Sequence, residues 1–179
     1  MARHIAFLRA INVGGHHKIP MVDLRTMFEA MNLKQVETFI ASGNVIFESP
    51  KSGSELEALI EQALLKGLGY EVRTFVRSDD ELAAVARELP FPVAESDGEA
   101  TVYVGFLSAP PDAAAKQTLA ALQTDIDALQ VQGRELYWLR RSRESELENG
   151  RLEKALKAKA TFRNLNTVTK LVAKYPACC

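Results

Sequence analysis

Cysteine is almost missing from this chain: the two that occur, Cys178 and Cys179, are adjacent and stand at the very end. Neighbouring terminal cysteines cannot cross-link a core, so the fold must hold without disulfides, as in a reducing compartment. Long apolar runs are also missing, since none approaches the roughly 18 residues of a membrane-spanning helix. Only five uncharged residues separate Arg3 from Arg9, too few for the apolar centre of a signal peptide. We therefore expect a cytoplasmic protein with no membrane segment.

Histidine is nearly as scarce, and its placement argues against a metal site. The three histidines are His4, His16 and His17, with no HxxxH or HxxE spacing and no mid-chain cysteine to join them. The phosphate loop GxxxxGK[ST], the dinucleotide motif GxGxxG and the nucleophile elbow GxSxG are absent too. We expect neither a metal nor a cofactor. No residue is distinguished as a nucleophile or general base, so the sequence leaves open whether the protein is an enzyme.

What the chain does contain is enough apolar sequence for a folded core and an uneven distribution of charge. Of its 179 residues, 47% are hydrophobic and 25% are charged, which suits one medium domain or two small ones. Residues 134–179 hold 11 Lys and Arg against 5 Asp and Glu, whereas residues 1–133 hold 11 against 18. A basic C-terminal quarter suits an anionic partner, although solvated helix faces have the same composition.

Hydrophobic periodicity in the first half predicts a split βαβ unit. Strands are expected over 3–10, 36–40, 45–48 and 70–77, with helices over 20–31 and from Ser54 to Gly69. Ser54 and Glu57 have the spacing of a capping box, and Ser42-Gly43-Asn44 is a turn signal. Strand, helix, strand, strand, helix, strand is the order of a ferredoxin-like fold, with an antiparallel sheet covered by two helices.

The second half repeats this order incompletely. After a helix over 79–89, strands are expected over 101–107, 126–131 and 135–140, with helices from Pro110 to about 123 and over about 145–158. The last segment, 164–174, has helical spacing, so no fourth strand is expected. The fold class is thus α/β (α+β), two tandem ferredoxin-like halves with antiparallel sheets and a C-terminal helix. The expected divisions are 1–78, a connection over 79–99, and 100–179.

The topology of the first half predicts a binding site for an anion. The first two strands of such a unit run parallel, so the loop Ile11–Lys18 and the turn Ser42–Asn44 lie at one edge of the sheet. Backbone N–H groups of the two glycines, two basic side chains and two amides would meet the ligand there. Ordinary turn chemistry accounts for the same residues. The candidate ligand-binding residues are Arg9, Asn12, Gly14, Gly15, Lys18, Ser42, Gly43 and Asn44.

The C-terminal segment supplies a second group of candidates. Asn166 and Lys170 are four residues apart and share one helix face. With Arg163, Asn164 and the basic residues Arg140, Arg141 and Arg143, they suit a surface for phosphate groups. The competing interpretation is that Asn164 caps a helix whose apolar residues pack it down, those residues being Leu165, Val168, Leu171 and Val172.

Several segments together resemble the bacterial family of uncharacterised proteins known as domain of unknown function 1697. They are Leu8-Arg9-Ala10-Ile11-Asn12-Val13-Gly14-Gly15, Lys18-Ile19-Pro20-Met21, Ser42-Gly43-Asn44-Val45-Ile46-Phe47 and residues 161–171. The chain departs from the family pattern at Ala10, Glu146 and Leu165, where glycine, lysine and tryptophan are expected. The resemblance implies an α/β fold and a cytosolic bacterial protein. It implies no activity, because the family has none established.

Three functions therefore stay open. The first is binding of a small phosphorylated or otherwise anionic ligand between the Asn12–Lys18 loop and the Ser42–Asn44 turn. The second is a nucleic-acid-associated module that uses the basic region 134–174; a pI near 6.3 and only 7% aromatic residues count against it. The third is a structural or interaction protein without a ligand. The sequence determines no oligomeric state.

Overall fold

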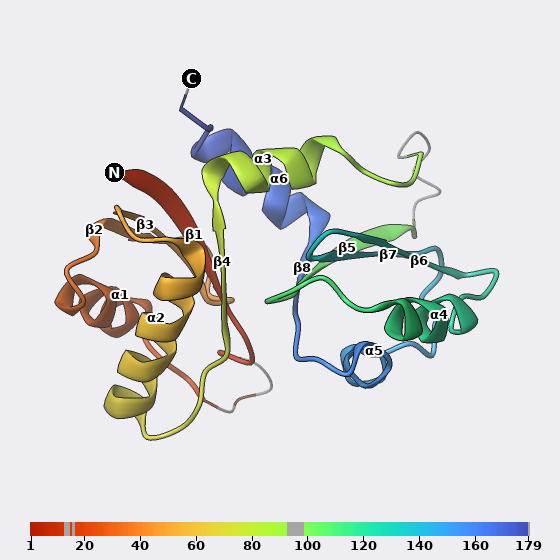
Figure 1. Ribbon diagram of the computed structural model, residues 1–179, viewed down its shortest axis with the longest axis horizontal. Coiled ribbons are helices and arrows are strands. Elements are labelled where there is room, and N and C mark those ends of the chain that lie inside the picture. Colours follow the sequence, from red (N-terminus) through yellow and green to blue (C-terminus); the bar gives the residue numbers. More distant parts are fainter. Residues whose placement is uncertain (13–14, 16, 93–98, 179) are drawn as a thin grey trace. The chain divides into compact units, whose positions relative to one another are not determined.

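A computed structural model describes residues 1–12, 15, 17–92 and 99–178. The chain forms two compact units, each built around its own sheet (Figure 1). Unit 1 comprises Met1–Leu82 with Tyr175–Cys179, and unit 2 comprises Ala83–Lys174. Both sheets have four antiparallel strands, so the predicted α+β class with two βαβ-type halves is confirmed.

Unit 1 has the ferredoxin-like strand order β2-β3-β1-β4. Helices α1 and α2 both cover one face of this sheet (Figure 1), and their buried residues pack against β1, β3 and β4 in one apolar core. The elements in chain order are β1 (Ala2–Leu8), α1 (Met21–Ala30), β2 (Lys34–Thr38), β3 (Asn44–Ser49), α2 (Gly53–Leu68) and β4 (Thr74–Ser78), followed by α3 (Asp79–Arg87).

Helix α2 begins two residues earlier than its sequence predicts. Its N-cap is Ser52, and the capping box is completed by Glu55, whose carboxylate accepts the Ser52 N–H at 2.9 Å. The predicted pair, Ser54 and Glu57, has the same spacing and is wrong as a cap. Both pairs satisfy the local rule for a capping box, so the choice depends on what else the glutamate contacts. The carboxylate of Glu57 instead accepts the N–H of Val76 in β4.

Unit 2 repeats the same order, and the prediction that it lacks a last strand is wrong. Its sheet has the order β6-β7-β5-β8, with β8 pairing antiparallel to β5. The buried positions of β8 are the polar residues Thr161 and Arg163, whereas Phe162 is only partly buried. The strand therefore has no apolar alternation to detect. The elements are β5 (Thr101–Phe106), α4 (Ala113–Ala121), β6 (Asp127–Gln132), β7 (Glu135–Arg140), α5 (Asn149–Leu156), β8 (Thr161–Asn164) and α6 (Leu165–Lys174).

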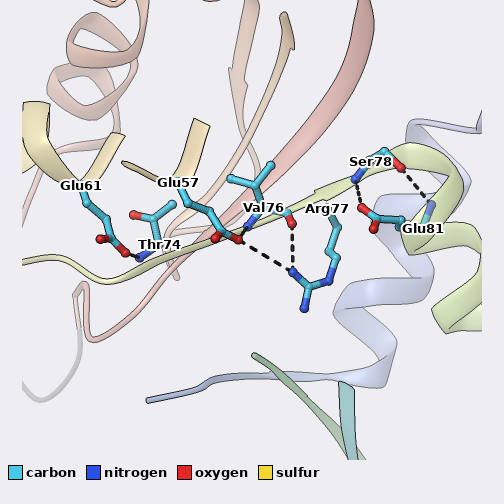
Figure 2. A network of polar contacts seen from close by, with 7 residues as sticks. All are labelled: Glu57, Glu61, Thr74, Val76, Arg77, Ser78 and Glu81. Atoms are coloured by element: carbon cyan, nitrogen blue, oxygen red, sulfur yellow. Dashed lines mark hydrogen bonds and ion pairs between the residues drawn. The ribbon is translucent and has the colours of Figure 1, made fainter. Parts of the chain in front are cut away.

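Glutamates cover the outer edge of β4, which is an edge strand of the sheet in unit 1 (Figure 2). Alternate residues of this strand point their N–H groups away from β1, a pattern that invites pairing with another chain. The spacing of alternate strand residues, about 6.7 Å, is close to the 6 Å between helix residues four apart, so α2 can cap two of them. The three contacts are Thr74 to Glu61 at 3.0 Å, Val76 to Glu57 at 2.9 Å, and Ser78 to Glu81 at 2.8 Å.

The carbonyl side of this edge is covered by an arginine. Arg77 is 1% exposed, and its Nη1 donates to the Val76 carbonyl at 2.9 Å and lies 4.0 Å from the Glu57 carboxylate (Figure 2). Unit 2 repeats the device: Arg163 Nη1 donates to the preceding carbonyl at 3.0 Å, and the carboxylate of Glu153 accepts the Ala160 N–H at 2.9 Å. The two halves thus share an edge-strand design as well as an order of elements.

Candidate functional site

The loop after β1 and the turn between β2 and β3 lie side by side in unit 1. The Leu8 N–H donates to the Gly43 carbonyl at 2.8 Å, which extends the pairing of β1 and β3 into the turn. Asn12 Nδ2 reaches across to the Ala41 carbonyl at 2.9 Å. This is the juxtaposition on which the predicted anion site depends.

Asn12 holds the loop together through its own side chain. Its Oδ1 accepts the Ile19 N–H at 2.8 Å, and its Nδ2 donates to the Ile19 carbonyl at 3.3 Å as well as to the β2–β3 turn. Both N–H groups of the carboxamide are therefore engaged. The geometry gives Asn12 the role of positioning the loop backbone.

Asn44 does the same work for the turn. It is fully buried, and its Nδ2 donates to the Phe39 carbonyl at 2.9 Å and to the Ser42 Oγ at 3.0 Å. A carboxamide buried in this way shapes the turn from beneath. Ser42 is exposed above it.

Left-handed backbone is concentrated in these two segments. Ile40 is the most unusual case, because a β-branched residue rarely adopts positive φ and this one is also 52% exposed. Gly43 is required by packing: a Cβ there would lie 3.1 Å from the Leu8 Cβ, in addition to its φ of 78°. Strained backbone of this kind tends to cluster at ligand sites. The φ values are 59° at Ala10, 56° at Asn12, 80° at Gly15, 50° at His17, 60° at Ile40 and 78° at Gly43.

Three basic side chains, those of Arg9, Lys18 and Arg73, lie in the loop or beside it. Arg9 is half-buried, and its N–H donates to the Arg73 carbonyl at 2.9 Å, so the two arginines are cross-strand neighbours. Lys18 is exposed, and the ring of His17 lies 4.0 Å from that of Tyr70. Arg73 also lies 3.5 Å from the Glu61 carboxylate, at a position where both side chains are partly exposed.

The two predicted glycines differ in what the structure says of them. Gly15 is exposed, and a Cβ placed on it would meet nothing within 4 Å, so its backbone is open to solvent. Gly14 lies outside the described residues. Sequence reasoning did not identify Arg73 or Tyr70; extending the β1–β4 register by one residue beyond Leu8 would have placed residue 73 opposite Arg9.

The C-terminal candidates belong to unit 2, and two of them serve its fold. Arg163 is 8% exposed and donates to the Thr161 Oγ1 at 2.7 Å; burial lowers the pKa of its guanidinium to about 10. Asn164 Oδ1 accepts the Asn166 N–H at 2.8 Å and so caps α6, as the competing interpretation of this segment expected. Asn166 and Lys170 are exposed on α6.

The part of the chain that the structure describes has neither a metal-binding cluster nor a membrane-spanning helix. Its residues contain no group of three or more His, Cys, Asp or Glu side chains arranged to hold a metal ion. Among its helices, none combines the length and the apolar character needed to cross a membrane.

Comparison with known proteins places the chain in a family and supports the fold. It is similar over 97% of its length, and over 98% of the other chain, to the solved structure of the conserved bacterial protein SP0830 from Streptococcus pneumoniae, with a TM-score of 0.74 and 24% sequence identity. At this identity the likeness concerns the fold. No curated protein matches the chain. Residues 1–137 match the family described as "Protein of unknown function (DUF1697)", and the chain belongs to that family.

Proposed function

We propose that unit 1 binds a small phosphorylated or otherwise anionic ligand between the Asn12–Lys18 loop and the Ser42–Asn44 turn. The observation that carries this proposal is the concentration of left-handed backbone in two loops joined by Asn12. Left-handed residues that alternate with right-handed ones direct successive N–H groups toward one side, which is the geometry of a concave anion site. The exposed, unobstructed Gly15 is the point where a ligand oxygen approaches the backbone most closely.

The charged side chains have different roles in this proposal. Lys18 is exposed and supplies a mobile ammonium group, whereas Arg9, half-buried beside Arg73, supplies a fixed positive charge. An oxyanion bound beside these side chains accepts charge-assisted hydrogen bonds from them. The two asparagines hold the loops in place, and nothing in this arrangement calls for catalysis.

The proposal is tested by following backbone amide resonances during titration with inorganic phosphate and with nucleotides. Shifts confined to residues 15–19 and 41–43 are expected. Because Lys18 is exposed, Lys18→Glu should leave the fold intact while weakening binding by about tenfold or more. Lys34→Glu is the matched control, since Lys34 is exposed at the opposite end of β2 and undergoes the same change of charge.

Two results would refute the proposal. One is undiminished binding by Lys18→Glu, and the other is an equal loss in Lys34→Glu. The dependence on salt separates this function from the nucleic-acid alternative, because a polymeric ligand with many phosphate contacts gives a steep salt slope and a small ligand gives a shallow one.

A further inference from the structure

A pocket lies in unit 2, at the end of its sheet where β5 begins and β7 ends. Its volume is about 280 Å³. Thr101 pairs with Arg140 across the two strands, and Tyr103 pairs with Trp138, so the floor is made of residues held in register by the sheet. Among the described residues, its lining comprises Glu99, Thr101, Tyr103, Arg140, Ser142 and Arg143.

The guanidinium of Arg140 is held in one orientation. Its Nε donates to the Ser142 carbonyl at 3.2 Å and its Nη2 donates to the Arg143 carbonyl at 2.9 Å, while the group lies 6.0 Å from the centre of the Trp138 ring. These contacts leave Nη1 without a hydrogen-bond partner among the described residues. A guanidinium fixed by its inner N–H groups loses little conformational entropy when the remaining N–H groups bind an oxyanion.

The other walls of the pocket supply hydrogen-bonding groups that the described part of the chain does not use. These are the hydroxyls of Thr101 and Tyr103 and the guanidinium of Arg143. Ser142 Oγ accepts the Glu144 N–H at 3.2 Å and keeps its own proton to donate. The Tyr103 ring packs against Trp138 with 5.2 Å between centroids, which fixes the position of its hydroxyl. In small-molecule sites a few convergent polar groups fix the orientation of the ligand, and these residues supply such groups.

Charge and size define the class of ligand. Two guanidinium groups favour an oxyanion, and the Glu99 carboxylate disfavours one unless the ligand also carries a hydrogen-bond donor. A volume of about 280 Å³ is just below the usual range for drug-sized ligands, so the pocket suits a smaller molecule. We propose that this pocket binds a small phosphate ester or carboxylate that also bears a hydroxyl or ammonium group. The oxyanion is held by Arg140 and Arg143, and the donor group is held by Glu99.

The chain provides its own reporter for this site. Trp138 is its only tryptophan, and it lies beneath Arg140 and beside Tyr103. Titration of the full chain with glycerol 3-phosphate and with O-phosphoserine should therefore change its tryptophan fluorescence in a saturable manner. Inorganic phosphate, which lacks the amino or alcohol donor, should bind more weakly, and glycerol should have no effect. Lactate and serine distinguish a carboxylate ligand from a phosphate ester.

Matched variants decide the outcome. Arg143→Glu should weaken binding by about tenfold or more, and Tyr103→Phe, which keeps the ring, should weaken it by a smaller factor. Arg151→Glu is the control, because Arg151 is exposed on α5 outside the pocket and changes charge equally. The proposal is overturned if no probe gives a saturable change, or if Arg151→Glu lowers the affinity as much as Arg143→Glu does. Lys18→Glu should leave this signal unchanged, so the two binding proposals fail independently.

Discussion

Replacing Glu57 by alanine removes the carboxylate that covers the middle of the β4 edge. Its side chain is 14% exposed, accepts the Val76 N–H at 2.9 Å and lies 4.0 Å from the buried guanidinium of Arg77. The substitution leaves a backbone donor without this acceptor and a buried cation without this partner. Glu57→Gln keeps an oxygen that can accept the Val76 N–H and removes only the charge.

The expected magnitude follows from these contacts. A hydrogen bond to a charged acceptor contributes about 1.5–3 kcal/mol, and breaking a buried ion pair costs about 3–5 kcal/mol. The 4.0 Å separation is long and Arg77 keeps its bond to the Val76 carbonyl, so the cost stays near the lower end. We expect Glu57→Ala to lower the free energy of unfolding of unit 1 by about 2–3 kcal/mol, and Glu57→Gln by about 1 kcal/mol.

Hydrogen exchange of the β4 amides, read by mass spectrometry, measures this loss where it occurs. A cost of about 2–3 kcal/mol accelerates exchange of the Val76 amide by roughly 30- to 160-fold. Glu29→Ala is the control, because its pair with Arg25 is exposed on both sides and contributes about 0.5 kcal/mol or less. If Glu57→Ala and Glu29→Ala accelerate exchange equally, the carboxylate does not protect this edge.

Three further predictions concern the buried residues His4, Gly43 and Asp127. His4 packs on Phe47 with neither ring nitrogen hydrogen-bonded to a described residue, and burial lowers the pKa of its imidazole. The folded state therefore loses stability as pH falls below about 6.5, the range in which the unfolded chain takes up the proton more readily. His4→Phe should flatten that part of a curve of stability against pH. Gly43→Ala should destabilise by about 1–3 kcal/mol in urea unfolding, whereas Gly150→Ala, unobstructed in a helix, should stabilise by about 0.5–1 kcal/mol. Asp127→Ala removes the acceptor of the Trp138 indole N–H at 2.8 Å, and should lower the thermal midpoint of unit 2 while shifting tryptophan emission; an unchanged midpoint would contradict this.

The order of elements in unit 1 was predictable because each element there carries its own local signal. Residues 3–10 are a short apolar run and residues 70–77 alternate, as strands do. Helices α1 and α2 have apolar residues three and four apart, and Gly69 ends α2 in the left-handed conformation that favours glycine. The same order also predicted that the loop after β1 would meet the β2–β3 turn, since it follows from the topology alone.

Local patterns gave a wrong prediction where two segments had the same capping-box spacing, and where the buried residues of a strand were polar. Ser52 with Glu55 and Ser54 with Glu57 both have the spacing of a capping box. The Val76 N–H donates to the Glu57 carboxylate, and the cap is formed by Ser52 and Glu55. Strand β8 was not predicted because its buried positions are the polar residues Thr161 and Arg163, which give no apolar alternation.

For the candidate site, the sequence by itself determined which residues gather at one edge of the first sheet, and only the tertiary structure decided what each of them does. Asn12 and Asn44 looked like ligand contacts, yet their amides are used by backbone carbonyls of the loops. The Arg9–Arg73 neighbourhood and the pocket beside Trp138 depend on strand register. Register brings together residues far apart in the chain, and no local pattern of a sequence encodes such a pairing directly.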